Sequence, residues 1–135
     1  MPGHRKRQKV LIADREKNSR EAMAEIFTDA GYAVSSASSG SETIEKLTRE
    51  SYDLIFCDFD MPRRSGPEIV RMARALNQRA KIIVISSSDG PSVRSRVKKE
   101  GAFELLNKPL RKDSLLKAAR KALEAPPTLE KKEVS

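Results

Sequence analysis

Short apolar runs alternate with longer amphipathic stretches along most of the chain. The apolar runs are residues 10–13, 32–34, 54–57, 82–85 and 103–106. Three of them are continuously apolar and do not alternate with polar residues, which is typical of strands in a parallel sheet that is covered on both faces. The pattern therefore predicts five strands, most of them buried.

Between these runs, apolar residues recur at the spacing of a helix. The clearest series consists of Met23, Ile26, Phe27 and Ala30, at positions i, i+3, i+4 and i+7. Asn18 with Glu21 predicts an N-terminal cap for this helix, and Gly31 predicts its end. Weaker series of the same kind are Ile44 and Leu47; Ile69, Met72, Ala73 and Leu76 after Pro67; Val93 and Val97; and Leu115 or Leu116, Ala119 and Leu123.

Strands and helices in strict alternation predict an α/β domain, because neighbouring parallel strands need a crossover connection and helices supply it. We expect one doubly wound domain with a five-stranded parallel sheet over residues 9–124. Residues 1–8 are expected to form a basic N-terminal arm and residues 125–135 a C-terminal tail. A chain of 135 residues is expected to hold a single domain of ordinary size.

Composition excludes several other classes of protein. Hydrophobic residues make up 38% of the chain and charged residues 34%, which suits one folded core, and no apolar run approaches the roughly 18 residues of a membrane span. The single cysteine, Cys57, lies in an apolar run and is expected to be a buried core thiol, so no intramolecular disulfide is available. The apolar run after the basic first residues is too short for a secretory signal. A cytoplasmic protein is expected.

The net charge of +8 is concentrated in two regions. Residues 1–9 hold four basic and no acidic residues, and residues 91–123 hold ten basic and three acidic residues. Such surfaces attract anionic partners, which include acidic proteins and nucleic acid. Few aromatic residues and no recognition motif make nucleic acid the weaker alternative. His4 has no partner cluster, and no ligand role is expected for it.

Polar residues follow four of the apolar runs, where the carboxyl ends of parallel strands form the ligand-binding edge of an open sheet. They are Asp14, Asp58, Ser86 and Lys108. Carboxylates hold a hard cation, and an ammonium and a hydroxyl group bind phosphoryl oxygens. An aspartate in such a setting can itself accept a phosphoryl group.

Four stretches, in this order and spacing, resemble the receiver domain of bacterial response regulators in two-component systems. They are KVLIADREKN (9–18), DLIFCDFDMP (53–62) with Gly66, KIIVISSS (81–88) and GAFELLNKP (101–109). The resemblance covers roughly residues 8–124. It implies a flavodoxin-like fold and a role in phosphorelay signal transduction.

The resemblance also implies a role for each site residue. Asp58 would accept a phosphoryl group from a phosphohistidine on a histidine kinase or phosphotransfer protein. Asp14, Asp58 and the backbone carbonyl of Asp60 would hold Mg²⁺. Ser86 and Lys108 would bind phosphoryl oxygens.

Two positions depart from the family pattern. Arg15 stands where a second acidic residue is usual, which predicts weak Mg²⁺ binding. Its side chain could pair with Asp14 or Asp58, or it could extend into solvent. Leu105 replaces the usual aromatic switch residue, which would weaken the link to the output face. The resemblance further implies a cis peptide bond before Pro109.

The family's output face usually combines the fourth helix, the fifth strand and the fifth helix. The basic residues in that stretch are Arg94, Arg96, Lys98, Lys99, Arg111, Lys112, Lys117, Arg120 and Lys121. We therefore expect an output protein with an acidic surface. The alternative to a binding surface is that these residues are scattered around two solvent-exposed helices and bind no partner.

The sequence favours a single-domain response regulator that is phosphorylated on Asp58, regulates a protein partner and is not an enzyme. Arg15 and Leu105 keep open a second interpretation, a degenerate receiver that serves as a phosphorylation-independent interaction module. Asp58 and Asp60 also form the DxD of aspartate-nucleophile phosphatases, which is the enzyme alternative. The residues after Asp60 do not follow that family's pattern.

Overall fold

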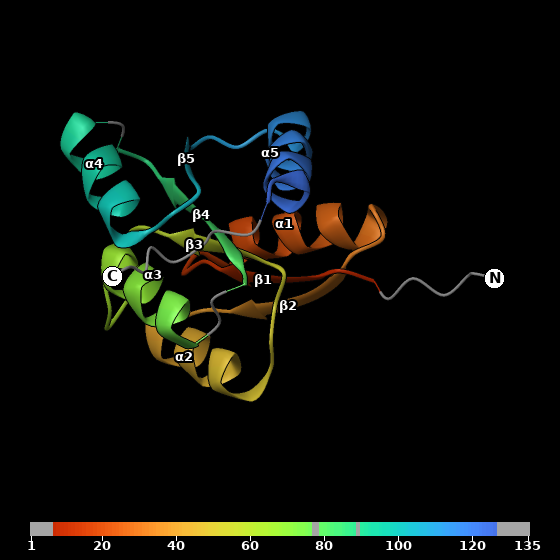
Figure 1. Cartoon of the computed structure of the whole chain (residues 1–135). Coiled ribbons are helices and arrows are strands. Elements are labelled where there is room, and N and C mark those ends of the chain that lie inside the picture. The colour runs from red at the N-terminus through yellow and green to blue at the C-terminus, as the bar shows by residue number, and fades with distance from the viewer. Residues whose placement is uncertain (1–6, 77–78, 89, 127–135) are drawn as a thin grey trace.

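The chain folds around one sheet of parallel strands in the order β2-β1-β3-β4-β5 (Figure 1). The computed structural model describes residues 7–76, 79–88 and 90–126. The strands are β1 (Lys9–Ala13), β2 (Ala33–Ala37), β3 (Leu54–Asp58), β4 (Lys81–Ser86) and β5 (Glu104–Asn107). The predicted α/β fold with five parallel strands is confirmed. Most of the expected arm and tail lies outside the described residues.

Helices cover both faces of the sheet, α1 and α5 on one face and α2, α3 and α4 on the other (Figure 1). The helices are α1 (Lys17–Asp29), α2 (Gly40–Arg49), α3 (Gly66–Leu76), α4 (Pro91–Glu100) and α5 (Lys112–Glu124). Within the described ranges, none of them is long and apolar enough to cross a membrane.

Alternate residues of each central strand point to opposite faces and enter two separate hydrophobic clusters. Ile55 and Cys57 pack on the side of α2, α3 and α4, whereas Leu54 and Phe56 pack on the side of α1 and α5. All five residues of β3 are buried, which explains why this run is continuously apolar up to Asp58. Asp58 therefore stands at the end of a fully buried strand.

The predicted start of the first helix is wrong. The N-cap residue of α1 is Glu16, whose side chain makes no capping hydrogen bond, and Asn18 lies inside the first turn. The sequence signal failed because this helix begins without a side-chain cap. Its predicted end is confirmed, since the helix stops before Gly31, which has a φ of 101°.

Two of the predicted apolar series differ in part from the elements in the structure. The second strand continues through Ser35 and Ser36, because β2 is an edge strand whose residues are only partly buried up to Ala37. Leu76 fits the helical spacing of α3 but is 45% exposed, because it is the last residue of that helix. The core face of α3 includes the predicted Ile69 and Ala73, together with Val70, which the predicted series did not contain.

Lys81, the first residue of β4, is a buried lysine with a structural explanation. Its Nζ donates hydrogen bonds to the carbonyl oxygens of Ala122 at 2.8 Å and Ala125 at 2.9 Å. These carbonyls lie at the C-terminal end of α5, where a cation is stabilised by the helix dipole. Burial lowers the pKa of Lys81. The side chain thereby ties the end of α5 to the sheet.

Gly66 begins α3 directly against the chain that leaves β3. Its N–H donates to the Phe59 carbonyl at 2.8 Å, and a Cβ atom at this position would lie 2.6 Å from Phe59 Cα. Gly66→Ala should therefore lower the free energy of unfolding by about 1–3 kcal/mol, measured by urea denaturation. Gly90→Ala is the matched control, because a Cβ there would meet nothing within 4 Å. Equal stability of the Gly66 variant and the parent would contradict this account of the loop.

Candidate functional site

The carboxyl edge of the sheet gathers the four predicted polar residues. Asp14 directly follows β1, Asp58 ends β3, Ser86 ends β4, and Lys108 directly follows β5. Parallel pairing in register puts these strand ends side by side, since Asp58 lies opposite Ile85 and Ser86 opposite Asn107. The sequence placed these residues at this edge correctly.

The Lys108 ammonium group lies between two buried carboxylates. Its Nζ is 3.5 Å from Asp58 Oδ2 and 3.8 Å from Asp14 Oδ2. The side chains of both aspartates are nearly inaccessible, whereas that of Lys108 is 23% exposed. The expected cis peptide bond between Lys108 and Pro109 is present. The arrangement places one cation where it can neutralise negative charge held by either carboxylate.

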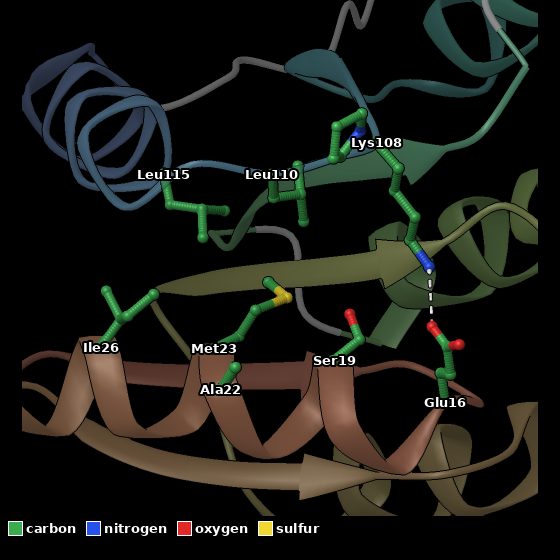
Figure 2. A pocket seen from close by; sticks show the side chains of 9 residues that line it. Glu16, Ser19, Ala22, Met23, Ile26, Lys108, Leu110 and Leu115 are labelled. Carbon is green, nitrogen blue, oxygen red and sulfur yellow. Dashed lines mark ion pairs between the residues drawn. The ribbon is translucent and has the colours of Figure 1, made fainter.

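Glu16 is a third acidic residue of this site, which the sequence analysis missed. Its Oε1 lies 4.0 Å from Lys108 Nζ, an ion pair drawn in Figure 2, and its N–H donates to Asp14 Oδ1 at 2.9 Å. The acidic residue two positions after Asp14 was the available signal. The family pattern places its second acidic residue directly after Asp14, so this pattern assigns no role to Glu16.

Asp58 carries a strongly perturbed carboxyl group. Burial raises the pKa of Asp58 from 3.8 to about 6, and the nearby charge of Asp14 acts in the same direction. The Lys108 ammonium and the Asp60 N–H, which donates to Asp58 Oδ1 at 3.2 Å, lower the pKa again but only in part. Burial thus makes ionisation of Asp58 less favourable than that of an exposed aspartate, and additional positive charge at the site would favour the ionised form.

The donor atoms at this edge fit a divalent cation that prefers oxygen ligands. Asp14 Oδ2 is buried and accepts no hydrogen bond among the described residues; beside its ion pair with Lys108 at 3.8 Å, it therefore keeps lone pairs that could bind an ion. Asp58 and the Asp60 carbonyl supply further oxygens of the kind that Mg²⁺ binds, and water fills its remaining positions. Among the described residues, no three side chains of the acidic, histidine or cysteine type converge at a metal-binding distance. The set is thus limited to two carboxylates.

Arg15 forms no ion pair with either of the two aspartates, which pair with Lys108 instead. Its side chain is exposed and forms no ion pair with any residue that the structure describes, although it lines the same pocket as Asp58 and Asp60. Of the two alternatives weighed for Arg15, the structure supports the solvent-facing one. The guanidinium still adds positive charge at the rim of the site.

Ser86 and Leu105 are both buried. The Ser86 hydroxyl accepts a hydrogen bond from the Ser88 N–H at 3.0 Å, and its neighbour Ser87 lines the pocket. The hydroxyl proton of Ser86 is left to donate, and its phosphoryl-binding role stays a prediction. Leu105 is 3% exposed and packs in the hydrophobic cluster on the side of α2, α3 and α4. Its side chain has no polar atom with which to signal a change at the site.

A pocket of about 490 Å³ opens over these groups. Its lining residues are Arg15, Glu16, Lys17, Asp58, Asp60, Ser87 and Lys108. An apolar groove begins beside Lys108 and runs between α1 and the start of α5, with Met23 and Ile26 on one wall and Leu110 and Leu115 on the other (Figure 2). The buried carboxylate of Asp58 thus lines an open pocket next to an apolar surface.

Comparisons with known proteins agree with this geometry. Residues 10–120 match the model of the response regulator receiver domain family. The response regulator MprA of Mycobacterium leprae is 30% identical over 85% of the chain, which spans half the length of that relative. Sporulation initiation phosphotransferase F of Bacillus subtilis is 26% identical over 86% of the chain and 94% of its own length.

Solved structures give the same result. The chemotaxis protein CheY4 of Vibrio cholerae is 29% identical, with a TM-score of 0.83 over 87% of the chain and all of that protein. A CheY-like receiver domain of Methanospirillum hungatei has a TM-score of 0.85 at 23% identity, over 88% of the chain and 95% of its own, and supports the fold alone. The family match, the parallel sheet and the aspartates at its carboxyl edge lead to one conclusion: the chain belongs to the response regulator receiver domain family.

Proposed function

We propose that Asp58 accepts a phosphoryl group from a phosphohistidine of a histidine kinase or phosphotransfer protein, and that phosphorylation regulates a protein partner. The observation that carries the proposal is the Lys108 ammonium group, 3.5 Å from Asp58 at the floor of an open pocket. Two-component phosphorelay signalling is the general role of receiver domains. We propose, beyond this general role, the kind of phosphoryl donor and the regulation of a protein partner. We also propose that this chain has no enzymatic activity of its own.

The chemistry follows from the charges at this edge of the sheet. A carboxylate oxygen of Asp58 attacks the phosphorus atom, an O–P bond forms, and the N–P bond to the donor imidazole breaks, returning its electron pair to the imidazole. Lys108 neutralises charge on the transferred phosphoryl oxygens, since its ammonium already faces Asp58 and Asp14. The apolar groove beside Lys108 gives the donor protein a surface to contact.

Receiver domains of this family typically bind Mg²⁺ at this site. Asp14, Asp58 and the Asp60 carbonyl would hold the ion in this chain, and the ion would supply positive charge to the phosphoryl oxygens. The burial of both carboxylates supports this assignment, as does the Asp14 Oδ2 atom, which accepts no hydrogen bond among the described residues. Arg15 supports weak binding, because it places a cation at the rim where an acidic residue is usual.

Arg15→Asp should tighten Mg²⁺ binding by about tenfold or more, because the change removes a positive charge beside the pocket and adds a carboxylate. Because residue 15 is exposed, solvent and salt screen the interaction between its side chain and the ion and reduce the effect on affinity. Titration of Mg²⁺ against the amide NMR signals around Asp58 measures the dissociation constant. Arg49→Asp is the charge-matched control, because it makes the same change in charge at an exposed residue that does not line the pocket, and it should leave the dissociation constant unchanged. Equal affinity in parent and Arg15→Asp would contradict the assigned role of Arg15.

The second candidate function is a phosphorylation-independent interaction module. Two observations favour it: the solvent-facing Arg15 and the buried, apolar Leu105. Incubation with a small phosphodonor separates the two functions. Stoichiometric phosphorylation supports the first, and absence of phosphorylation at saturating Mg²⁺ supports the second.

We also propose that the output protein presents an acidic surface to α4 and α5. On α4, Arg94 and Lys98 lie four residues apart and are exposed, and the same holds for Lys117 and Lys121 on α5. Residues at this spacing share one side of a helix, so their fields add. None of these four side chains forms an ion pair within the described part of the chain.

Reversing two of these charges should abolish partner recovery at low salt. Lys98→Glu with Lys121→Glu turns attraction into repulsion, and pull-downs from a lysate of the source organism measure the loss. Arg49→Glu with Arg79→Glu makes the same change in charge away from α4 and α5 and should recover the partner as the parent does. Unchanged recovery with the first pair would contradict the proposal, and loss after nuclease treatment would point to nucleic acid.

A further inference from the structure

A second pocket adjoins the pocket over Asp58, which we call the acidic pocket, and four of the ten residues that line this second pocket are arginines. It has a volume of about 460 Å³ and lies between the segment that follows β3 and helix α4. Arg15 and Asp60 line both pockets. We call this pocket the arginine groove and define it by four of its lining residues: Arg15, Arg63, Arg64 and Arg96.

The positive charge of the arginine groove is largely uncompensated. Its acidic lining residues are Asp60 and Glu68, and Glu68 is already paired with Arg64 at 2.8 Å. In the part of the chain that the structure describes, the other three arginines form no ion pair. One carboxylate, that of Asp60, thus faces three guanidinium groups. Several positive charges in one concave site make its electrostatic potential strongly positive, which favours the binding of an anion.

The arginines are presented by a well-fixed segment. Arg63 has a φ of 74°, a left-handed conformation that is uncommon for a residue with a side chain. The segment around it is held at both sides, because the Gly66 N–H donates to the Phe59 carbonyl at 2.8 Å and the Gly40 N–H to the Pro62 carbonyl at 3.2 Å. The turn that carries Arg63 therefore keeps its place before any ligand arrives.

The opposite wall is formed by α4. The Arg96 guanidinium lies over the Phe59 ring, 5.6 Å from its centre. This cation–π contact orients the guanidinium without using its hydrogen-bond donors on a carboxylate. Arg96 therefore keeps donors available toward the groove from the side opposite Arg63.

We propose that the arginine groove binds a small phosphorylated anion with more than one negative charge. Planar guanidinium groups match phosphate oxygens in pairs, and the pocket volume is in the range of small-ligand sites. The site is separate from Asp58 and Lys108, neither of which lines the groove. Because Arg15 and Asp60 line both pockets, an anion in the groove should also raise the affinity of the acidic pocket for a cation, and the reverse.

Titration with pyrophosphate as the probe tests the proposal on the full chain without metal ions. Amide NMR shifts locate the binding site, and calorimetry gives the affinity. We expect saturable binding, with the largest shifts in residues 59–65 and around Arg96, and weaker binding of inorganic phosphate. Arg63→Gln with Arg96→Gln should weaken pyrophosphate binding by about tenfold or more, since both replaced groups are charged donors. Both side chains are exposed, so the fold tolerates the change.

Arg49→Gln with Arg120→Gln is the matched control, because it removes the same charge from exposed positions outside the groove. It should leave the affinity within about twofold of the parent's. Equal weakening in both double variants would overturn the proposal in favour of diffuse attraction. Shifts centred on Asp58 and Lys108, or no saturable binding, would also overturn it.

Measuring phosphoryl uptake in the same proteins separates a failure of this inference from a failure of the proposed function. The Arg63→Gln, Arg96→Gln variant should bind pyrophosphate more weakly, by the factor given above, and keep phosphoryl uptake at Asp58. Pyrophosphate binding in a parent chain that takes up no phosphoryl group would leave the groove standing and reject the proposed function. Uptake without pyrophosphate binding would reject the groove alone.

Discussion

Asp58→Asn is expected to abolish phosphoryl uptake by this chain. Asp58 is the carboxylate at the end of the central strand β3, and it faces the pocket with Lys108 Nζ at 3.5 Å. An asparagine fills nearly the same volume but offers an amide, which is not a nucleophile at neutral pH. Uptake should fall below detection when intact mass is followed during incubation with a small phosphodonor and Mg²⁺.

Asp60→Asn is the matched control for this variant. Its side chain is exposed and close to the same pocket, and its backbone N–H and carbonyl groups are unchanged by the substitution. Uptake should therefore persist in the control. Phosphorylation of Asp58→Asn at a rate like the parent's would show that another residue accepts the group.

The same Asp58→Asn substitution should stabilise the fold at neutral pH in the absence of metal ions. Burial raises the pKa of Asp58 to about 6 in the folded chain, against 3.8 for the ordinary carboxyl group. Between these two values the folded state binds more protons than the unfolded state, so the stability of the parent falls as pH rises through this window. The lost stability amounts to at most about 3 kcal/mol. The asparagine side chain of the variant carries no charge and avoids this loss.

Urea denaturation in a metal chelator, at several pH values, measures the effect. Asp58→Asn should exceed the parent in stability above about pH 7, and the gain should disappear below about pH 3, where the Asp58 carboxyl is mostly protonated in both states. The groups that face Asp58 are Asp14 and Lys108, and both are unchanged in the variant. A gain that is independent of pH would contradict the electrostatic explanation.

The strands of this fold could be predicted from sequence because both faces of the sheet are covered. A run such as residues 54–57 contains no polar residue, so its pattern differs clearly from that of an element with a solvent-exposed face. The edge strand β2 was recognised only in part, since Ser35 and Ser36 carry no such signal. The start of α1 at Lys17 was missed because Glu16 makes no side-chain cap, and the rule that favoured Asn18 depends on such a cap.

The sequence was sufficient to predict those residues of the main site that lie at the ends of strands. Asp14, Asp58 and Lys108 come together because the topology of a parallel sheet brings these ends to one edge. The direction of the Arg15 side chain could not be predicted, since an exposed arginine is not directed by packing. The arginine groove was missed for a related reason: Arg63 and Arg96 lie far apart in sequence, and only the packing of α4 beside the segment after β3 joins them.

The central claim is that this chain takes up one phosphoryl group on Asp58 with the help of Mg²⁺. Intact-protein mass spectrometry of the parent, incubated with a small phosphodonor with and without Mg²⁺, tests it most directly, with peptide mapping to locate the group. The account predicts a single added phosphoryl group on the peptide that contains Asp58, formed faster with Mg²⁺. No added mass at saturating Mg²⁺, or a phosphoryl group on a different peptide, would contradict it.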